Sequence, residues 1–157
     1  MTSNKELAVR NSVLKTYPSG ASFINKFNFD YCMSEFKANS YSAALRINVL
    51  KLREIASAYN EDTPKILIEA WLVNFSTFIG VEITSQQCRE TAGFLYEEGY
   101  MLNLAELTFF FKRLKKGYYG KFYGKFDGMS IISACRTYRM ERGKLIASMS
   151  EAERKLI

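Results

Sequence analysis

The chain has 157 residues, of which 48% are hydrophobic and 15% aromatic, and its formal net charge is +6. This length suits one domain whose core needs no disulfide or metal, and the composition excludes a disordered protein. There is no histidine, so the usual general base and the commonest zinc ligand are absent. We therefore expect a protein that is not an enzyme and that binds neither a metal nor another cofactor.

The cysteines and the pattern of apolar residues indicate in which cellular compartment the protein is expected. Cys32, Cys88 and Cys135 are too far apart to form a C-x-x-C pair, and their odd number favours free thiols in a reducing compartment. The N-terminus, MTSNKELAVRN, lacks the apolar core of a signal peptide, and polar residues interrupt the most apolar run, 66–81. These features predict a soluble, cytoplasmic protein without a membrane segment.

The first 40 residues are predicted to form one short helix and an aromatic arm. The helix runs from about Lys5 to Lys15 and ends before Pro18 and Gly20. Residues 22–42 are aromatic and polar without a strong period, which suggests an arm with one helical turn. The aromatic residues of the arm are candidate contacts for a protein partner: Phe23, Phe27, Phe29, Tyr31 and Phe36.

Two helices are predicted in the middle of the chain. From Ala43 to Tyr59, apolar residues recur at spacings of four and three, which indicates one amphipathic helix. Thr63 followed by Pro64 is typical of a helix start. The next helix, KILIEAWLVNFSTFIG, is apolar on nearly all sides, so we expect it in the middle of a bundle with Trp71 as a core anchor.

Capping signals define the helices that follow. Residues 84–87, TSQQ, form a capping box, and Gly99 is a plausible end for the helix that begins there. Asn103 and Glu106 form a second box for the helix NLAELTFFFKRLKK, which ends at Gly117.

Asp127 is predicted to cap the helix GMSIISACRTYRMERG, with Phe126 and Ile131 at the positions of a hydrophobic staple. The inward stripe of this helix continues to Arg142, so we expect this arginine to pair with a carboxylate or to pack its stem rather than to bind a ligand. Residues 150–153, SEAE, begin a short terminal helix or a tail.

Together these elements predict an all-α, compact bundle of five to six helices. The expected division is a helix with the aromatic arm in residues 1–40, a helical bundle domain in 41–146, and a tail or short helix in 147–157. A loop rich in glycine and tyrosine joins the last two main helices.

Basic residues gather in the final third of the chain. Residues 112–144 contain ten basic and two acidic residues, a net charge of +8, whereas the remainder has a net charge of −2. A basic end on a slightly acidic body is the distribution expected of a protein that binds a polyanion.

The loop Lys115–Gly128, KKGYYGKFYGKFDG, carries four glycines, five aromatic residues and four lysines. Its spacing does not match a nucleotide-binding P-loop or a dinucleotide fingerprint. GYYG matches the G-x-x-G of one RNA-binding class, but the sheet of that class has no place in a helical chain. The glycines allow a phosphate backbone to come close, or allow the rings of the loop to fold inward, and these two interpretations are compatible.

The helix before this loop has one unusual aromatic position. At 100° per residue, its apolar face lies opposite Lys112, Arg113 and Lys116, and Phe109 falls among these cations. A ring among cations can stack on nucleic-acid bases while the lysines contact phosphates. Alternatively, another helix or the N-terminal arm covers the ring.

Arg136 and Arg139 project away from the inward stripe of their helix, which makes them phosphate candidates, although a solvated face is the simpler interpretation. The candidate nucleic-acid-binding residues are Phe109, Lys112, Arg113, Lys115, Lys116, Tyr118, Tyr119, Lys121, Tyr123, Lys125, Arg136 and Arg139.

Several short motifs lie between Ile66 and about Lys144. They are EAWL (69–72), NLAEL (103–107), KGYYG (116–120) with YG (123–124), DG (127–128), and Tyr138 with ER (141–142). In these motifs the chain resembles short helical proteins of phages and bacterial mobile elements, which look like replication accessory factors of the helicase-loader kind. The resemblance implies a helical module in a bacterial host that joins DNA to a replicative helicase, and it carries over no catalytic residue.

The leading hypothesis is therefore a non-enzymatic accessory protein that binds DNA or RNA through its basic final third. The alternative is an inhibitor or adaptor whose aromatic arm binds a helicase or another host protein. A third hypothesis is a virion or structural protein in which the arm supports an oligomer. The sequence leaves the oligomeric state open.

Overall fold

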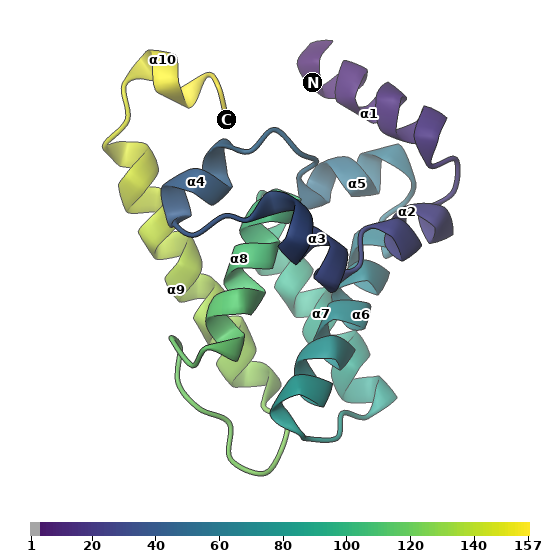
Figure 1. The fold of residues 1–157 in the computed structure, drawn as a ribbon, viewed down its shortest axis with the longest axis vertical. Coiled ribbons are helices and arrows are strands. Elements are labelled where there is room, and N and C mark those ends of the chain that lie inside the picture. Colours follow the sequence, from purple (N-terminus) through teal and green to yellow (C-terminus); the bar gives the residue numbers. More distant parts are fainter. Residues whose placement is uncertain (1–3) are drawn as a thin grey trace.

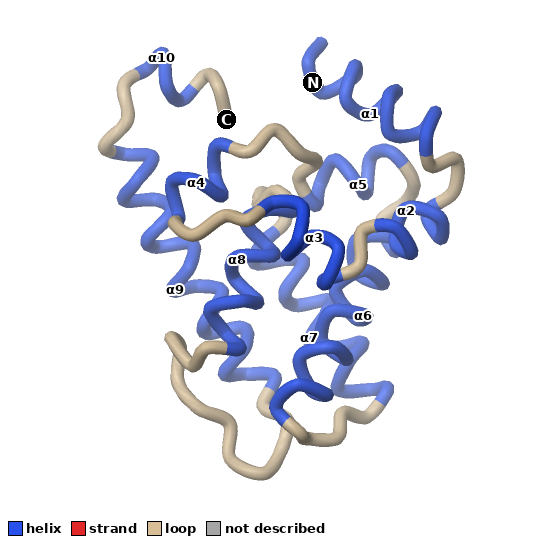
Figure 2. Tube along the Cα trace, in the orientation of Figure 1, coloured by secondary structure: helices blue, strands red, loops and turns tan. Residues whose placement is uncertain are grey.

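The computed structural model describes residues 4–157, and this part of the chain contains ten helices (Figure 1). They are α1 (Asn4–Thr16), α2 (Gly20–Lys26), α3 (Phe29–Phe36), α4 (Tyr41–Arg46), α5 (Leu52–Ala58), α6 (Asp62–Ile79), α7 (Ser85–Gly99), α8 (Leu104–Lys115), α9 (Gly128–Ala147) and α10 (Glu151–Arg154). Residues 4–157 contain no strand, as Figure 2 shows. The predicted all-α class is confirmed, but the helices outnumber the five to six expected.

Helix α8 lies at the centre of the molecule, and α3, α4, α6 and α9 pack around it (Figure 1). All residues from 104 to 111 are buried. The prediction that the apolar helix α6 takes the central place is wrong, because α6 leaves Ile66, Val73 and Phe78 exposed. Trp71 of α6 does act as a core anchor, with 2% of its surface exposed.

The segment predicted as an aromatic arm, residues 22–42, contains most of α2, all of α3 and the first two residues of α4. Ser19 begins α2 with a capping box, and Asn28 begins α3 by accepting the Tyr31 N–H on its side-chain oxygen (2.9 Å). These caps satisfy helix N–H groups that would otherwise lack partners, which favours helix over extended chain. The expectation of an arm with one helical turn is therefore wrong.

Aromatic side chains connect α2 and α3 to the bundle. The ring of Phe29 meets those of Trp71 and Phe111 edge to face, at 5.5 and 6.3 Å between centres. The Trp71 indole N–H donates to the Phe27 carbonyl at 3.3 Å. Phe23 is fully buried and stacks on Phe27. The aromatic content of this segment belongs to the core.

The helix predicted from Ala43 to Tyr59 is interrupted at residues 47–51. Here the chain pairs with the start of α8: the Leu52 N–H donates to the Leu102 carbonyl (2.8 Å), and the Leu104 N–H donates to the Leu50 carbonyl (2.9 Å). Hydrogen bonds to a backbone about fifty residues away thus replace local helical ones in this segment.

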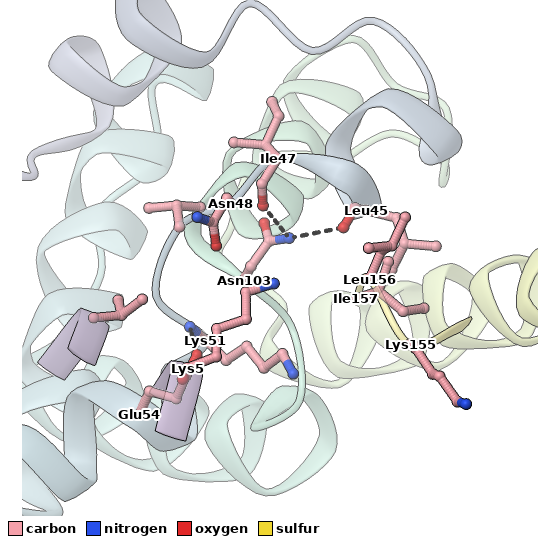
Figure 3. Close-up of a pocket in the computed structure, with 12 residues that line it drawn as sticks. Lys5, Leu45, Ile47, Asn48, Lys51, Glu54, Asn103, Lys155, Leu156 and Ile157 are labelled. Atoms are coloured by element: carbon pink, nitrogen blue, oxygen red, sulfur yellow. Dashed lines mark hydrogen bonds between the residues drawn. The ribbon is translucent and has the colours of Figure 1, made fainter. Parts of the chain in front are cut away.

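Asn103 ties this junction together (Figure 3). Its side-chain oxygen accepts the Glu106 N–H (2.8 Å), and Glu106 Oε1 accepts the Asn103 N–H (3.2 Å), which confirms the predicted capping box. The Asn103 side-chain NH₂ also donates to the carbonyls of Ala44, Leu45 and Ile47 at 3.1 to 3.4 Å. One buried amide therefore joins the end of α4 to the start of α8.

The predicted helix starts at Thr84 and Ser150 are present as well, but the predicted cap at Thr63 is not. Thr84 and Gln87 form the box that begins α7, and Ser150 and Glu153 form the box that begins α10. The side chain of Asn60 accepts the Thr63 N–H at 2.9 Å, so α6 begins slightly before the predicted Thr63–Pro64 start.

The Asp-Gly pair before α9 has a separate role for each residue. Asp127 caps α9 by accepting the Ser130 N–H at 3.1 Å. Gly128 lies against α7, where an added Cβ would come within 2.5 Å of the Thr91 hydroxyl oxygen. The staple residues Phe126 and Ile131 are both buried. This junction fixes where the segment 116–127 returns to the bundle.

Candidate nucleic-acid interface

Arg113, in the last turn of α8, is surrounded by aromatic rings. Its guanidinium carbon lies 4.3 to 5.6 Å from the centres of four rings, those of Tyr118, Tyr41, Tyr119 and Phe109. Its Nε donates to the Tyr119 hydroxyl at 3.0 Å. Burial lowers the pKa of Arg113, but the Tyr119 hydrogen bond and neighbouring hydroxyls raise it more, so the side chain stays charged.

A pocket of about 270 Å³ opens beside this arginine. We call it the Arg113 pocket. It is lined by Asn39, Phe109, Lys112, Arg113, Lys116 and Tyr118. Lys112 Nζ donates to Asn39 Oδ1 at 2.8 Å, which holds that ammonium at the rim. Three cations thus surround one small opening that no acidic side chain lines, a composition suited to an anion.

Phe109 is only 5% exposed, although it lines this pocket. Its ring meets Tyr41 edge to face at 5.4 Å and Tyr138 at 6.2 Å. Of the two interpretations given for Phe109, cover by another helix describes the structure, and α4 supplies that cover. Phe109 is therefore not available to stack on a base in this structure.

Lys115 lies apart from the pocket. Its Nζ donates to Asn74 Oδ1 and lies 4.1 Å from the ring centre of Phe29. Burial lowers the pKa of Lys115. Although it belongs to the same basic run, this lysine faces α3 and α6.

The loop residues divide between the core and the surface. Phe122 packs against Phe75 with 5.2 Å between ring centres, and Phe126 is buried. Tyr119 also points inward: burial raises the pKa of its hydroxyl, which hydrogen-bonds to the Tyr41 hydroxyl at 3.1 Å.

The exposed side chains between Gly117 and Phe126 are those of Tyr118, Lys121, Tyr123 and Lys125. Tyr118 is 62% and Tyr123 82% exposed. Gly120 has a φ of +108°, a conformation that favours glycine. The loop thus anchors part of its aromatic content and presents the rest with its lysines.

Arg136 and Arg139 project from α9 toward α7, where both bind Glu98. The nitrogen–oxygen distances are 3.0 and 2.9 Å. The hydrogen bond from Arg136 lowers the pKa of Glu98 most; burial opposes it, and Arg139 adds to the lowering. These two phosphate candidates already have a carboxylate, and they lie outside the Arg113 pocket.

The remaining basic residues of α9 are paired too. Arg142 Nε donates to Glu106 Oε2 at 2.7 Å, which confirms the predicted ion pair, and Glu106 is only 1% exposed. Lys144 pairs with Glu141 at 3.2 Å. By contrast, within residues 4–157 none of the six basic residues between 112 and 125 has a carboxylate within 4.0 Å. Within the basic run 112–144, the charge without a carboxylate partner therefore lies at the end of α8 and in the loop.

The residues proposed as partner contacts lie largely in the core. Phe23 and Phe29 are buried, and Phe27, Tyr31 and Phe36 are half-buried. The first two cannot reach a partner without opening the bundle.

Two residues of the site escaped sequence analysis. Asn39 and Tyr41 come from the start of α4 and the segment before it, about seventy residues from Arg113. Only Ser40, which caps α4, marked that segment in the sequence. Nothing in it signalled a contact with α8.

The described residues contain no cluster of three metal-binding side chains, and none of the helices in 4–157 is long and apolar enough to span a bilayer. All three cysteines are buried, and burial raises the pKa of each thiol, to about 12 for Cys32 and Cys135. These thiols are therefore poorly suited to act as nucleophiles.

Residues 82–155 match the profile of DUF6633, a family of unknown function. The match begins before α7 and ends just after α10, so it includes the Arg113 pocket except for Asn39. Neither the comparison with curated proteins nor that with solved structures gives a match.

Proposed function

We propose that this protein is a non-enzymatic nucleic-acid-binding protein that contacts phosphates through the Arg113 pocket and the two exposed loop lysines, Lys121 and Lys125. The observation that carries the proposal is the separation of charges: cations of 112–125 have no carboxylate partner in the described chain, whereas those of α9 do. Unpaired cations around a concave site favour a polyanion.

The sequence resemblance described above extends this proposal to a role. In this role, the protein serves the replication of a phage or mobile element as an accessory factor of the helicase-loader kind. The role would depend on binding alone, because the sequence carries no nucleotide-binding motif.

The salt dependence of binding tests the proposal. Each phosphate contact releases counterions, so log K falls with log salt at a slope of about 0.9 per contact for duplex DNA and about 0.7 for a single strand. We expect the double variant Lys112→Ala/Lys116→Ala to bind more weakly and to reduce the slope by about 1.4 to 1.8. Fluorescence anisotropy with labelled single and double strands at several salt concentrations measures both quantities.

A matched control separates local charge from net charge. Lys144→Ala/Lys155→Ala also removes two positive charges, but from lysines that pair with carboxylates. Lys144 pairs with Glu141 of α9, and Lys155 pairs with Glu151 of α10. This control should bind like the wild type. Equal weakening in both double variants, or a flat salt dependence in the wild type, would contradict the proposed site.

A further inference from the structure

We infer that the Arg113 pocket is a site for single-stranded nucleic acid, in which Tyr118 is the platform on which one unpaired base stacks. This inference rests on the proposed function and adds the strand form and the base-contacting residue.

The first support is the pairing of Tyr118 with Arg113. The guanidinium carbon lies 4.3 Å from the centre of the Tyr118 ring, close enough for a cation–π interaction. Yet the residue remains 62% exposed. The ring is thus held on one side and open to solvent elsewhere.

The second support is that Arg113 is itself fixed. Its Nε is bound by the Tyr119 hydroxyl, and the rings of Tyr41 and Phe109 lie within 5.6 Å of its guanidinium carbon. A ring that is positioned before binding loses little conformational entropy when a ligand stacks on it. Tyr118 is therefore better prepared as a platform than Tyr123, for which the described chain shows no ring or cation contact.

The third support is the arrangement of charge. Lys112 and Lys116 lie one helical turn apart and line the same pocket as Tyr118. Sites that bind single strands combine the same two features: cations that contact the phosphate backbone, and an aromatic ring on which a base stacks. The pocket, at about 270 Å³, is near the lower end of the roughly 300–1,000 Å³ typical of ligand sites, which is room for one unit of a polymer.

The exposed ring of Tyr118 also favours a single strand over a duplex as the ligand. In a duplex, each base already stacks on its neighbours and pairs with its complement, so a surface tyrosine gains a base face only after unpairing. A flexible single strand presents its base faces freely. A site that used phosphates alone would gain nothing from the exposed ring.

Anisotropy with four probes of equal length tests this inference: a dT strand, an rU strand, an abasic DNA strand with the same phosphates, and a duplex. We expect the wild type to bind the dT or rU strand more tightly than the abasic strand and the duplex. Tyr118→Ala should weaken binding to the base-containing strand roughly five- to hundredfold and leave the abasic strand unaffected. Tyr118→Phe should bind like the wild type, because it keeps the ring.

Tyr100→Ala, at another exposed tyrosine, is the matched control and should not change binding, and far-UV circular dichroism checks that each variant is folded. Equal affinity for the dT, rU and abasic strands, or equal losses on them in Tyr118→Ala, would overturn the inference but leave salt-dependent phosphate binding intact. Full competition by polyglutamate would point instead to an acidic protein surface. Absence of binding to every strand would reject the proposed function itself.

Discussion

Asp127 holds the start of α9 with two oxygens of one carboxylate. Oδ1 accepts the Ser130 N–H at 3.1 Å, and Oδ2 accepts the Ser130 hydroxyl at 2.6 Å. The Ser130 side chain contributes most to lowering the pKa of Asp127, and the backbone N–H adds to it. The cap is therefore ionised at neutral pH, and its charge favours the positive end of the helix dipole.

This lowered pKa predicts a pH dependence. A carboxylate whose pKa is lower in the folded state stabilises the fold above its unfolded pKa, and that contribution disappears as the pH falls through the folded pKa. Asp127→Asn keeps an oxygen for the cap but removes the charge, so we expect a loss of less than about 1 kcal/mol at neutral pH. The difference between the variant and the wild type in the free energy of unfolding should disappear as the pH falls from roughly 5 to 2.

Urea unfolding at a series of pH values measures this effect. Glu97→Gln, which removes a carboxylate from an exposed position on α7, is the matched control. A wild-type advantage that persisted unchanged at the lowest pH would show that the charge of Asp127 is not responsible.

The site residues show which predictions the local sequence can support. The ion pair of Arg142 was predictable because it continues a buried stripe, where a lone charge is costly. The burial of Phe109 and the sharing of Glu98 by two arginines depend on side chains from α4 and α7, distant in the chain. Helical projection shows which way a residue points, but not what it meets.

At the level of helices, the junction of α4 and α8 depends on Asn103. Its amide caps α8 and also satisfies three carbonyls where α4 ends. Capping motifs are local, so the start of α8 was predictable from Asn103 and Glu106. The break at residues 47–51 was not, because the partners of those backbone groups lie at 102–104.

We expect Asn103→Ala to destabilise the fold by about 2–4 kcal/mol, since it removes a helix cap and leaves buried carbonyls without donors. Ser150→Ala, which removes the cap of the short peripheral helix α10, should cost less than about 1 kcal/mol. Urea unfolding followed by far-UV circular dichroism compares the two. Similar losses for both variants would contradict the role of Asn103 at the junction.

For the molecule as a whole, the N-terminal helices are part of one core. Trp71, the only tryptophan, contacts Phe29 of α3 and Phe111 of α8 and also binds the backbone before α3. The all-α class was predictable from periodicity. The central place of α8 rather than α6 was not, because apolar content indicates burial without saying which helix has neighbours on every side.

This arrangement predicts a single unfolding transition. Tryptophan fluorescence, which reports on the contact of α3 with α6, and far-UV circular dichroism, which reports on all helices, should give the same urea midpoint. Phe29→Ala should lower the free energy of unfolding by about 3–5 kcal/mol and shift both signals together. The half-buried Phe36→Ala should cost less, and separate midpoints in the wild type would show that α2 and α3 unfold independently.

The segment that follows α8 lies far from both termini along the long axis (Figure 1), and this has a practical consequence. In Figure 1 the segment that follows α8 lies at one end of the molecule, and α1 and α10 lie at the other. A tether or affinity tag attached next to either of those helices would lie at the opposite end from the segment that carries Tyr118 and the loop lysines (Figure 1). Surface-immobilised protein is therefore suitable for single-molecule measurements of strand capture and release.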